Sequence, residues 1–137
     1  MATVHETLQQ LRTEYLVEAV ENVGRIDRMI GRLEAEGPDP GVLESLHRRF
    51  LGLAGSGFTY GFPLVSRLGR EGERTCAAFL RNDQPLPPRE IHDLRRLLGE
   101  LRDEFERLHA AYSVGPWLRR TAPSDRTRTT AWALWPA

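Results

Sequence analysis

A glycine-rich stretch near the middle of the chain comes closest to a pattern with known chemistry. Residues 50–62 have the sequence FLGLAGSGFTYGF, which contains four glycines. The segment GLAGSGFT has the G-x-x-x-x-G-x-T spacing of a phosphate-binding loop, but Phe58 stands where that loop needs its lysine, and no apolar strand precedes it. The glycine patterns of a dinucleotide site and of a nucleophile elbow also fail, at Tyr60 and around Ser56. The stretch therefore predicts neither a phosphate loop nor a serine nucleophile.

The side chains that most often bind metals or move protons are scattered. No two of the histidines and the single cysteine lie four residues apart, the spacing that places two ligands on one face of a helix. Glu71 and Glu73 are two residues apart, so on a helix they point in different directions and form no acid–base pair. We therefore predict no metal, no cofactor and no catalytic residue, and we expect the histidines to be surface or helix-cap residues. These are His5, His47, His92 and His109.

The composition favours a single domain that does not bind nucleic acid. The chain has 137 residues, and its 19 basic residues, all arginine, balance 19 acidic ones, whereas nucleic-acid binders carry a basic excess. One cysteine excludes an intramolecular disulfide, and the segment RTCAAFLR favours a buried Cys76 over a reactive thiol. The first residues lack a signal pattern, and no apolar run approaches the ~20 residues of a membrane span. We therefore expect a cytoplasmic protein with no membrane contact.

Apolar residues recur at helical spacings of three and four over most of the chain. This pattern predicts helices over residues 4–36, 40–60, 63–81 and 88–112, and no stretch alternates as a strand would. The segments EGPDPG and NDQPLPP interrupt the pattern, and Asp39 and Pro40 are suited to begin the second helix. Four amphipathic helices with short connections predict an all-α fold, an antiparallel four-helix bundle. The predicted core positions are Leu8, Leu11, Tyr15, Ala19, Val23, Ile26, Ile30 and Leu33; Leu43, Leu46, Phe50, Leu53 and Gly57; Val65, Leu68, Cys76 and Phe79; and Ile91, Leu94, Leu98, Leu101, Phe105 and Leu108.

The last part of the chain differs in character from the rest. Residues 114–137 have no sustained period and mix proline, threonine, serine and arginine. We therefore predict a bundle over residues 1–113 and an irregular C-terminal tail or linker over residues 114–137. The tail contains Trp117, Trp132 and Trp135, which either dock on the bundle or belong to the edge of a further domain.

The second predicted helix has an apolar residue on the face that ought to be solvated. At about 100° per residue, Leu43 and Phe50 fall within about 60° of Leu46 and form the core face, whereas Leu51 falls about 140° away. Small residues adjoin Leu51, and an apolar surface of this kind is typical of a contact site. The alternative is that Leu51 belongs to a wider core. The predicted contact surface comprises His47, Arg48, Leu51, Ala54, Gly55 and Phe58, with Arg67 and Arg70 of the third helix as its rim.

The segment LHRRFLGLAGSGFTYGFPLVSRLGREGE resembles the signature of histidine phosphotransfer (HPt) domains, the four-helix modules of multistep two-component phosphorelays. The resemblance covers residues 11–112. In that family the second helix carries the motif H-x-L-[K/A]-G-S, whose exposed histidine accepts a phosphoryl group from the aspartate of a receiver domain. Residues 53–56, LAGS, match the end of this motif, but its histidine falls on Leu51. Leucine has no lone pair, so the resemblance implies a docking surface without its phosphate acceptor.

The resemblance implies a degenerate HPt domain, a monomer that binds a receiver domain or kinase partner without accepting phosphate. Two alternatives remain open. In the first, the chain is an active phosphotransfer protein that uses His47, one helical turn or about 6 Å before Leu51, although Leu51 then occupies the place of the family's clearing glycine. In the second, it is a helical scaffold that dimerises through Leu51.

Overall fold

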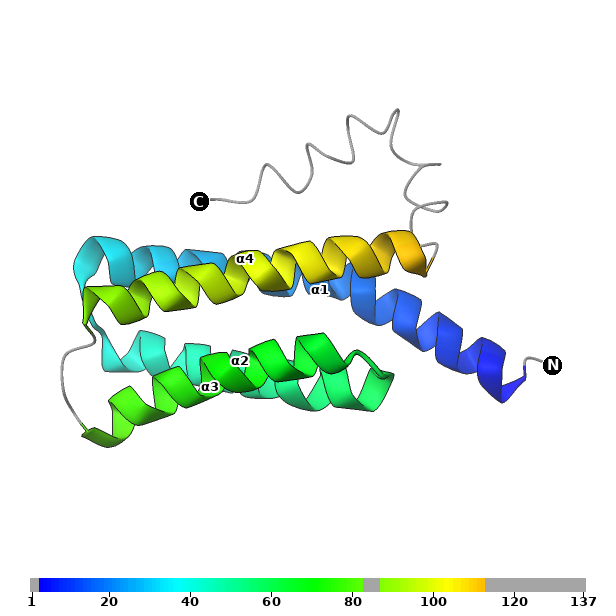
Figure 1. Ribbon diagram of the computed structural model, residues 1–137, viewed down its shortest axis with the longest axis horizontal. Helices are drawn as coiled ribbons and strands as arrows, with labels where there is room; N and C mark the ends of the chain where they lie inside the picture. Colours follow the sequence, from blue (N-terminus) through cyan, green and yellow to red (C-terminus); the bar gives the residue numbers. More distant parts are fainter. Residues whose placement is uncertain (1–2, 83–86, 113–137) are drawn as a thin grey trace, which may run out of the picture.

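The chain folds into four helices arranged in two layers. The computed structural model describes residues 3–82 and 87–112, and its helices are α1 (Val4–Glu36), α2 (Pro40–Tyr60), α3 (Pro63–Asn82) and α4 (Pro88–Ala111). Consecutive helices run in opposite directions, with α1 beside α4 in one layer and α2 beside α3 in the other (Figure 1). The described residues contain no strand. The predicted all-α, antiparallel four-helix bundle is confirmed, and each helix ends within one residue of its expected bounds.

Local signals set the ends of the first two helices. The Thr3 hydroxyl accepts a hydrogen bond from the Glu6 backbone N–H, and the Glu6 carboxylate accepts one from the Thr3 backbone N–H, so α1 begins with a capping box. Asp39 caps α2, whose first residue is Pro40. Helix α2 ends at Gly61, which adopts the left-handed conformation at φ 79°. These ends were predictable because each signal lies within a few residues of the end it sets.

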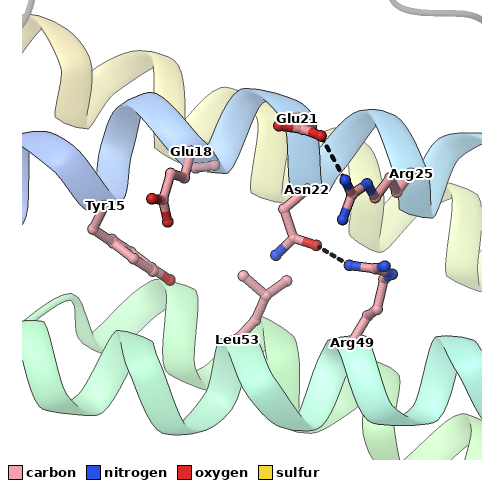
Figure 2. Close-up of a pocket in the computed structure, with 8 residues that line it drawn as sticks. Tyr15, Glu18, Glu21, Asn22, Arg25, Arg49 and Leu53 are labelled. Atoms are coloured by element: carbon pink, nitrogen blue, oxygen red, sulfur yellow. Dashed lines mark hydrogen bonds and ion pairs between the residues drawn. The ribbon is translucent and has the colours of Figure 1, made fainter.

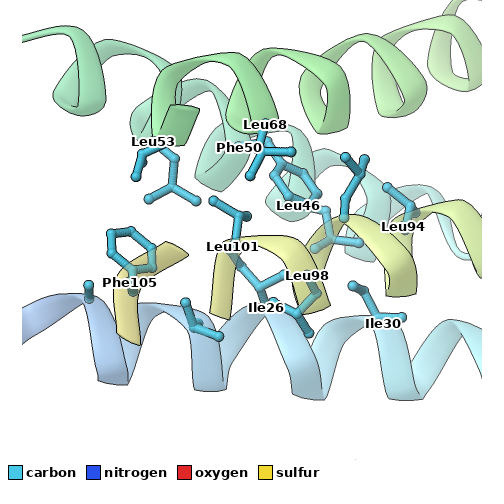
Figure 3. Close-up of a cluster of buried hydrophobic side chains, with 14 of the residues drawn as sticks. Ile26, Ile30, Leu46, Phe50, Leu53, Leu68, Leu94, Leu98, Leu101 and Phe105 are labelled. Carbon is cyan, nitrogen blue, oxygen red and sulfur yellow. The ribbon is translucent and has the colours of Figure 1, made fainter. Parts of the chain in front are cut away.

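The apolar faces of the four helices meet in one core (Figure 3). The predicted core positions of α2 and the positions from Leu94 to Leu108 of α4 are buried, and the structure adds Leu16 and Leu97 to the core. Leu11 is a correction, because its side chain is 42% exposed. The next residue, Arg12, donates a hydrogen bond to the carbonyl oxygen of Tyr60, the last residue of α2, so Leu11 lies where the bundle ends and is only partly covered.

Helices α2 and α3 approach each other closely because glycines line their contact. A Cβ atom on Gly69 would lie 2.7 Å from the backbone nitrogen of Ala54 and 2.8 Å from the carbonyl oxygen of Phe50. A Cβ atom on Gly57 would lie 2.7 Å from the backbone nitrogen of Ser66. Neither position has room for a side chain, since protein interiors are close-packed. The two helices therefore form a tight pair that fixes which side of α2 remains exposed.

Cys76 and His109 are among the titratable side chains that the bundle buries. Cys76 is fully buried, as predicted, and this burial, together with the nearby Glu73 carboxylate, raises the pKa of its thiol to about 12. His109 is a correction to the expected surface position, because it is 5% exposed. It follows Phe105 by one turn on α4, so it lies on the side of that helix that faces the core.

A buried ion pair connects α1 to α4. The Asp27 side chain is buried in α1 and binds the guanidinium of Arg95, which also binds Glu34 at 2.6 Å. The hydrogen bond to Glu34 makes the largest contribution to a raised pKa of Arg95, and the Asp27 carboxylate adds to it. The pair specifies how α1 and α4 align, because a charge buried without its partner is strongly destabilising.

Two predictions concern the last residues of the chain and lie outside the described residues. These are the tail over residues 114–137, with the division at residue 113, and the docking of Trp117, Trp132 and Trp135. In the part of the chain that the structure describes, none of the four helices is long and apolar enough to cross a membrane.

Candidate functional site

The exposed side of α2 carries a strip of apolar and small residues. Leu51 is 52% exposed and Phe58 is 78% exposed, and Gly52 and Gly55 between them are also exposed. Residues three, four and seven apart adjoin along one side of a helix, so these positions form a continuous surface. The alternative that Leu51 belongs to the core is therefore wrong. We call this strip the outer face of α2, and it consists of Arg48, Leu51, Gly52, Gly55 and Phe58.

The small residues of α2 point in three directions. Gly57 faces α3, and the hydroxyl of Ser56 lies 2.8 Å from the hydroxyl of Tyr15 on α1. On Gly52 or Gly55, by contrast, an added Cβ would meet no atom within 4 Å. Each glycine in a helix interior costs roughly 0.8–1 kcal/mol relative to alanine, and packing within the described bundle requires neither of these two. Their small size favours a role in contact with another molecule.

Ala54 is a correction to the predicted contact surface. Its side chain is 6% exposed, and the hydroxyl of Ser66 on α3 donates a hydrogen bond to its carbonyl oxygen at 2.7 Å. Gly69 packs directly against its backbone nitrogen. The helical period placed Ala54 on the same side as Leu51, but it could not show that α3 covers that part of α2. Ala54 therefore does not belong to the accessible surface.

His47 lies between α2 and α3 rather than on the open surface. It is half-buried, and its Nε2 atom lies 3.0 Å from Oε1 of Glu73 on α3. A phosphoryl group that approached this nitrogen would have to displace the carboxylate and would meet its negative charge. Glu73 is 26 positions from His47 in the sequence, and no sequence pattern linked the two.

The predicted arginines border the outer face of α2 to different degrees. Arg48 is exposed and pairs with Glu44 at 2.7 Å, one turn away on the same helix. Arg67 and Arg70 are both exposed on α3, and within the described residues neither forms an ion pair. Arg70 precedes Glu73 by one turn, so it lies on the flank of α3 that adjoins His47. That Arg67 and Arg70 form the rim of the contact surface stays a prediction.

The described residues of the outer face of α2 offer contact rather than bond-making chemistry. The nearest hydroxyl belongs to Thr59, and it donates a hydrogen bond to the carbonyl oxygen of Gly55 at 3.0 Å. On the α1 side, burial raises the pKa of the Tyr15 phenol, which leaves it neutral at pH 7. Within the described ranges no group of three or more histidine, cysteine, aspartate or glutamate side chains is arranged to hold a metal ion.

Sequence reasoning did not assign Gly52 to the site. The signal was present, because Gly52 follows Leu51 directly and falls on the exposed side of the same helical period. Its role became visible only when the structure separated it from Gly57, which the bundle needs for close packing.

Comparisons with known proteins do not identify the site, so it is interpreted from its own geometry. No family model, no curated protein and no solved structure matches the chain. The resemblance to HPt domains is therefore an inference from the motif around Leu51.

Proposed function

We propose that the chain is a docking module of HPt type, which binds a receiver domain through the outer face of α2 and accepts no phosphate at position 51. One observation carries this proposal. Leu51 is exposed beside Gly52 and Gly55, and the bundle itself requires neither glycine. The four-helix fold and the match of residues 53–56 to the motif support it.

A leucine at position 51 can contact a partner protein but cannot accept a phosphoryl group. Phosphoryl transfer from an aspartyl phosphate needs a nucleophilic nitrogen in line with the phosphorus atom, and a leucine side chain has none. Burial of an exposed leucine or phenylalanine against a partner contributes up to about 1.5–3 kcal/mol, so Leu51 and Phe58 can anchor a complex. The module therefore binds its partner and leaves the phosphoryl group on the partner's aspartate.

The test uses receiver domains from the source genome, phosphorylated with acetyl phosphate in the presence of Mg²⁺. The unaltered chain is expected to bind at least one of them in calorimetry and to gain no acid-labile phosphate. Leu51→His is expected to gain it, because the imidazole nitrogen forms a bond to phosphorus while the bond from phosphorus to the aspartate oxygen breaks. Leu51→Asp should abolish binding, whereas Leu11→Asp, at the exposed leucine of α1, should not.

The same experiment decides between the alternatives. Phosphate that appears on the unaltered chain and disappears with His47→Ala would identify an active phosphotransfer protein, although the hydrogen bond between His47 and Glu73 argues against it. A dimer in sedimentation that Leu51→Asp dissociates, together with no binding to any receiver domain, would identify a scaffold.

A further inference from the structure

A groove runs between α1 and α2, where the two helices are held apart. Figure 2 shows its first part, a hollow of about 390 Å³ whose buried apolar lining comes from Ala19 and Leu53. A second hollow of about 430 Å³ shares Asn22 and Arg49 with the first, so the two hollows adjoin along the groove. A hydrogen bond of 3.1 Å from Arg49 to Asn22 crosses it.

Acidic side chains line one end of this groove and arginines line the other, and Glu21 pairs with Arg25 at 2.6 Å where the two groups meet (Figure 2). Glu18 and Glu21 line the end near Tyr15, and Glu14 continues the acidic row one turn before them, since spacings of four and three keep all three on one side of α1. Towards the other end the charged groups are basic. The arginines that line this part are Arg25, Arg48 and Arg49.

The chain continues from the acidic end of the groove. The ring of Tyr112, the last described residue, lies 5.7 Å from the guanidinium carbon of Arg12, which precedes Glu14 by two residues on α1. The 25 residues that follow contain four arginines and one aspartate. At roughly 3.3 Å per residue, Arg119 can reach about 23 Å from Tyr112, whereas α1 rises only about 9 Å from Arg12 to Glu18.

We propose that the α1–α2 groove binds the chain's own segment PWLRRTAPSDR, residues 116–126. Arg119 and Arg120 pair with Glu18 and, in competition with Arg25, with Glu21, and Trp117 packs at the acidic end of the groove. The charges support this direction, because the first charged residues of the segment are two arginines, whereas the end of the groove near Tyr15 carries glutamates, of which Glu18 forms no ion pair within the described residues.

The segment binds the groove more strongly than a free peptide of the same sequence would, because it is covalently joined to the bundle. An exposed ion pair contributes little to binding, so two such pairs would hold a free peptide weakly. A segment joined to the bundle by a few residues is present at an effective concentration in the millimolar range, and weak contacts then suffice. This inference does not depend on the receiver partner proposed above.

Tryptophan fluorescence measures this contact selectively, because all three tryptophans lie in residues 113–137. Trp132→Phe with Trp135→Phe leaves Trp117 as the only reporter. In the full chain at low salt, we expect blue-shifted emission and acrylamide quenching about twofold weaker than for N-acetyltryptophanamide, independent of protein concentration. Salt at about 1 M, where the Debye length is about 3 Å, should strengthen the quenching.

Variants with reversed charges test whether the segment binds in the α1–α2 groove. Glu18→Arg with Glu21→Arg should raise the quenching of Trp117 to that of the free compound, and adding Arg119→Glu with Arg120→Glu should restore protection. Asp103→Arg with Glu106→Arg, at two exposed acidic residues of α4, makes the same charge change outside the groove and should have no effect. Circular dichroism verifies the helices, and the salt response of the unreversed chain provides the result if the reversal variant does not fold.

Three results would overturn the proposal. The first is quenching in the unreversed chain equal to that of the free compound. The second is protection of Trp117 that neither the charge reversals nor salt change, which would place the segment elsewhere. The third is protection that increases with protein concentration, which would mean that a second copy fills the groove.

Discussion

The two flanks of α2 are built differently. On the α3 side the backbones meet, because Gly69 and Gly57 have no side chains to separate them. On the α1 side the long side chain of Arg49 reaches Asn22 and leaves a groove of about 390 Å³ beside it. The closed flank contributes stability, whereas the open flank and the adjoining outer face of α2 leave surface for binding. The same residue type thus has opposite roles, since an added Cβ collides at Gly69 and meets nothing at Gly55.

The largest expected effect is on the reactivity of the Cys76 thiol, and it tests whether α3 stays packed against the rest of the bundle. Burial raises the pKa of Cys76 on α3 from 9.0 to about 12, so at pH 8 its thiolate fraction is about 1000-fold below that of an exposed cysteine. Ellman's reagent should therefore react at least that much more slowly with the native chain than with the chain in urea. Rapid reaction in native buffer would mean that α3 opens readily.

The same shift predicts how stability depends on pH. The raised pKa means that the unfolded chain releases the Cys76 proton first as pH rises. The contribution of this thiol to the free energy of unfolding is therefore complete below pH 9 and decreases from there towards pH 12. Urea titrations at several pH values, with Cys76→Ala as the control, isolate the contribution of the thiol.

Gly69→Ala tests the close packing of α2 against α3. The new Cβ would lie 2.7 Å from the Ala54 nitrogen, so the helices must separate, and overpacking of this kind typically costs about 1–3 kcal/mol. The loss should appear as a lower urea midpoint, even though alanine favours the helix by about 1 kcal/mol. An unchanged urea midpoint would show that the backbone of α2 does not pack closely against Gly69.

Gly55→Ala makes the same substitution where the structure leaves space. Its added Cβ meets no atom within 4 Å, so only the helix propensity changes, and we expect a gain of about 0.5–1 kcal/mol in the free energy of unfolding. The comparison with Gly69→Ala uses identical chemistry at both sites. A loss of stability would contradict the open outer face of α2.

The smallest expected effect is that of Leu51→Ala on stability. Leu51 is half exposed, so the free energy of unfolding should change by no more than about 0.5 kcal/mol. Leu53→Ala, two residues away in the core, should cost about 2–5 kcal/mol. A large effect at Leu51 would mean that its role is packing.

Much of the fold was predictable because its signals are local. Pro40 and Gly61 begin and end α2, and hydrogen bonding within a few residues of each is sufficient to set the boundary. The helical period also predicted that Leu51 and Phe58 are exposed while Leu53 is buried. Where the period failed, at Leu11, the residue still fits the pattern but lies at the end of the bundle, next to Arg12, which contacts the last residue of α2.

The sequence by itself determined four amphipathic helices, their ends, and an apolar residue, Leu51, on the exposed side of the second helix. Only the tertiary structure decided that Ala54 is covered, that His47 binds Glu73, and that a groove separates α1 from α2. The physical reason is the range of the interactions. Helix period and capping arise among residues a few positions apart, whereas the side on which a neighbouring helix packs depends on contacts between distant residues, such as Gly69 against Ala54.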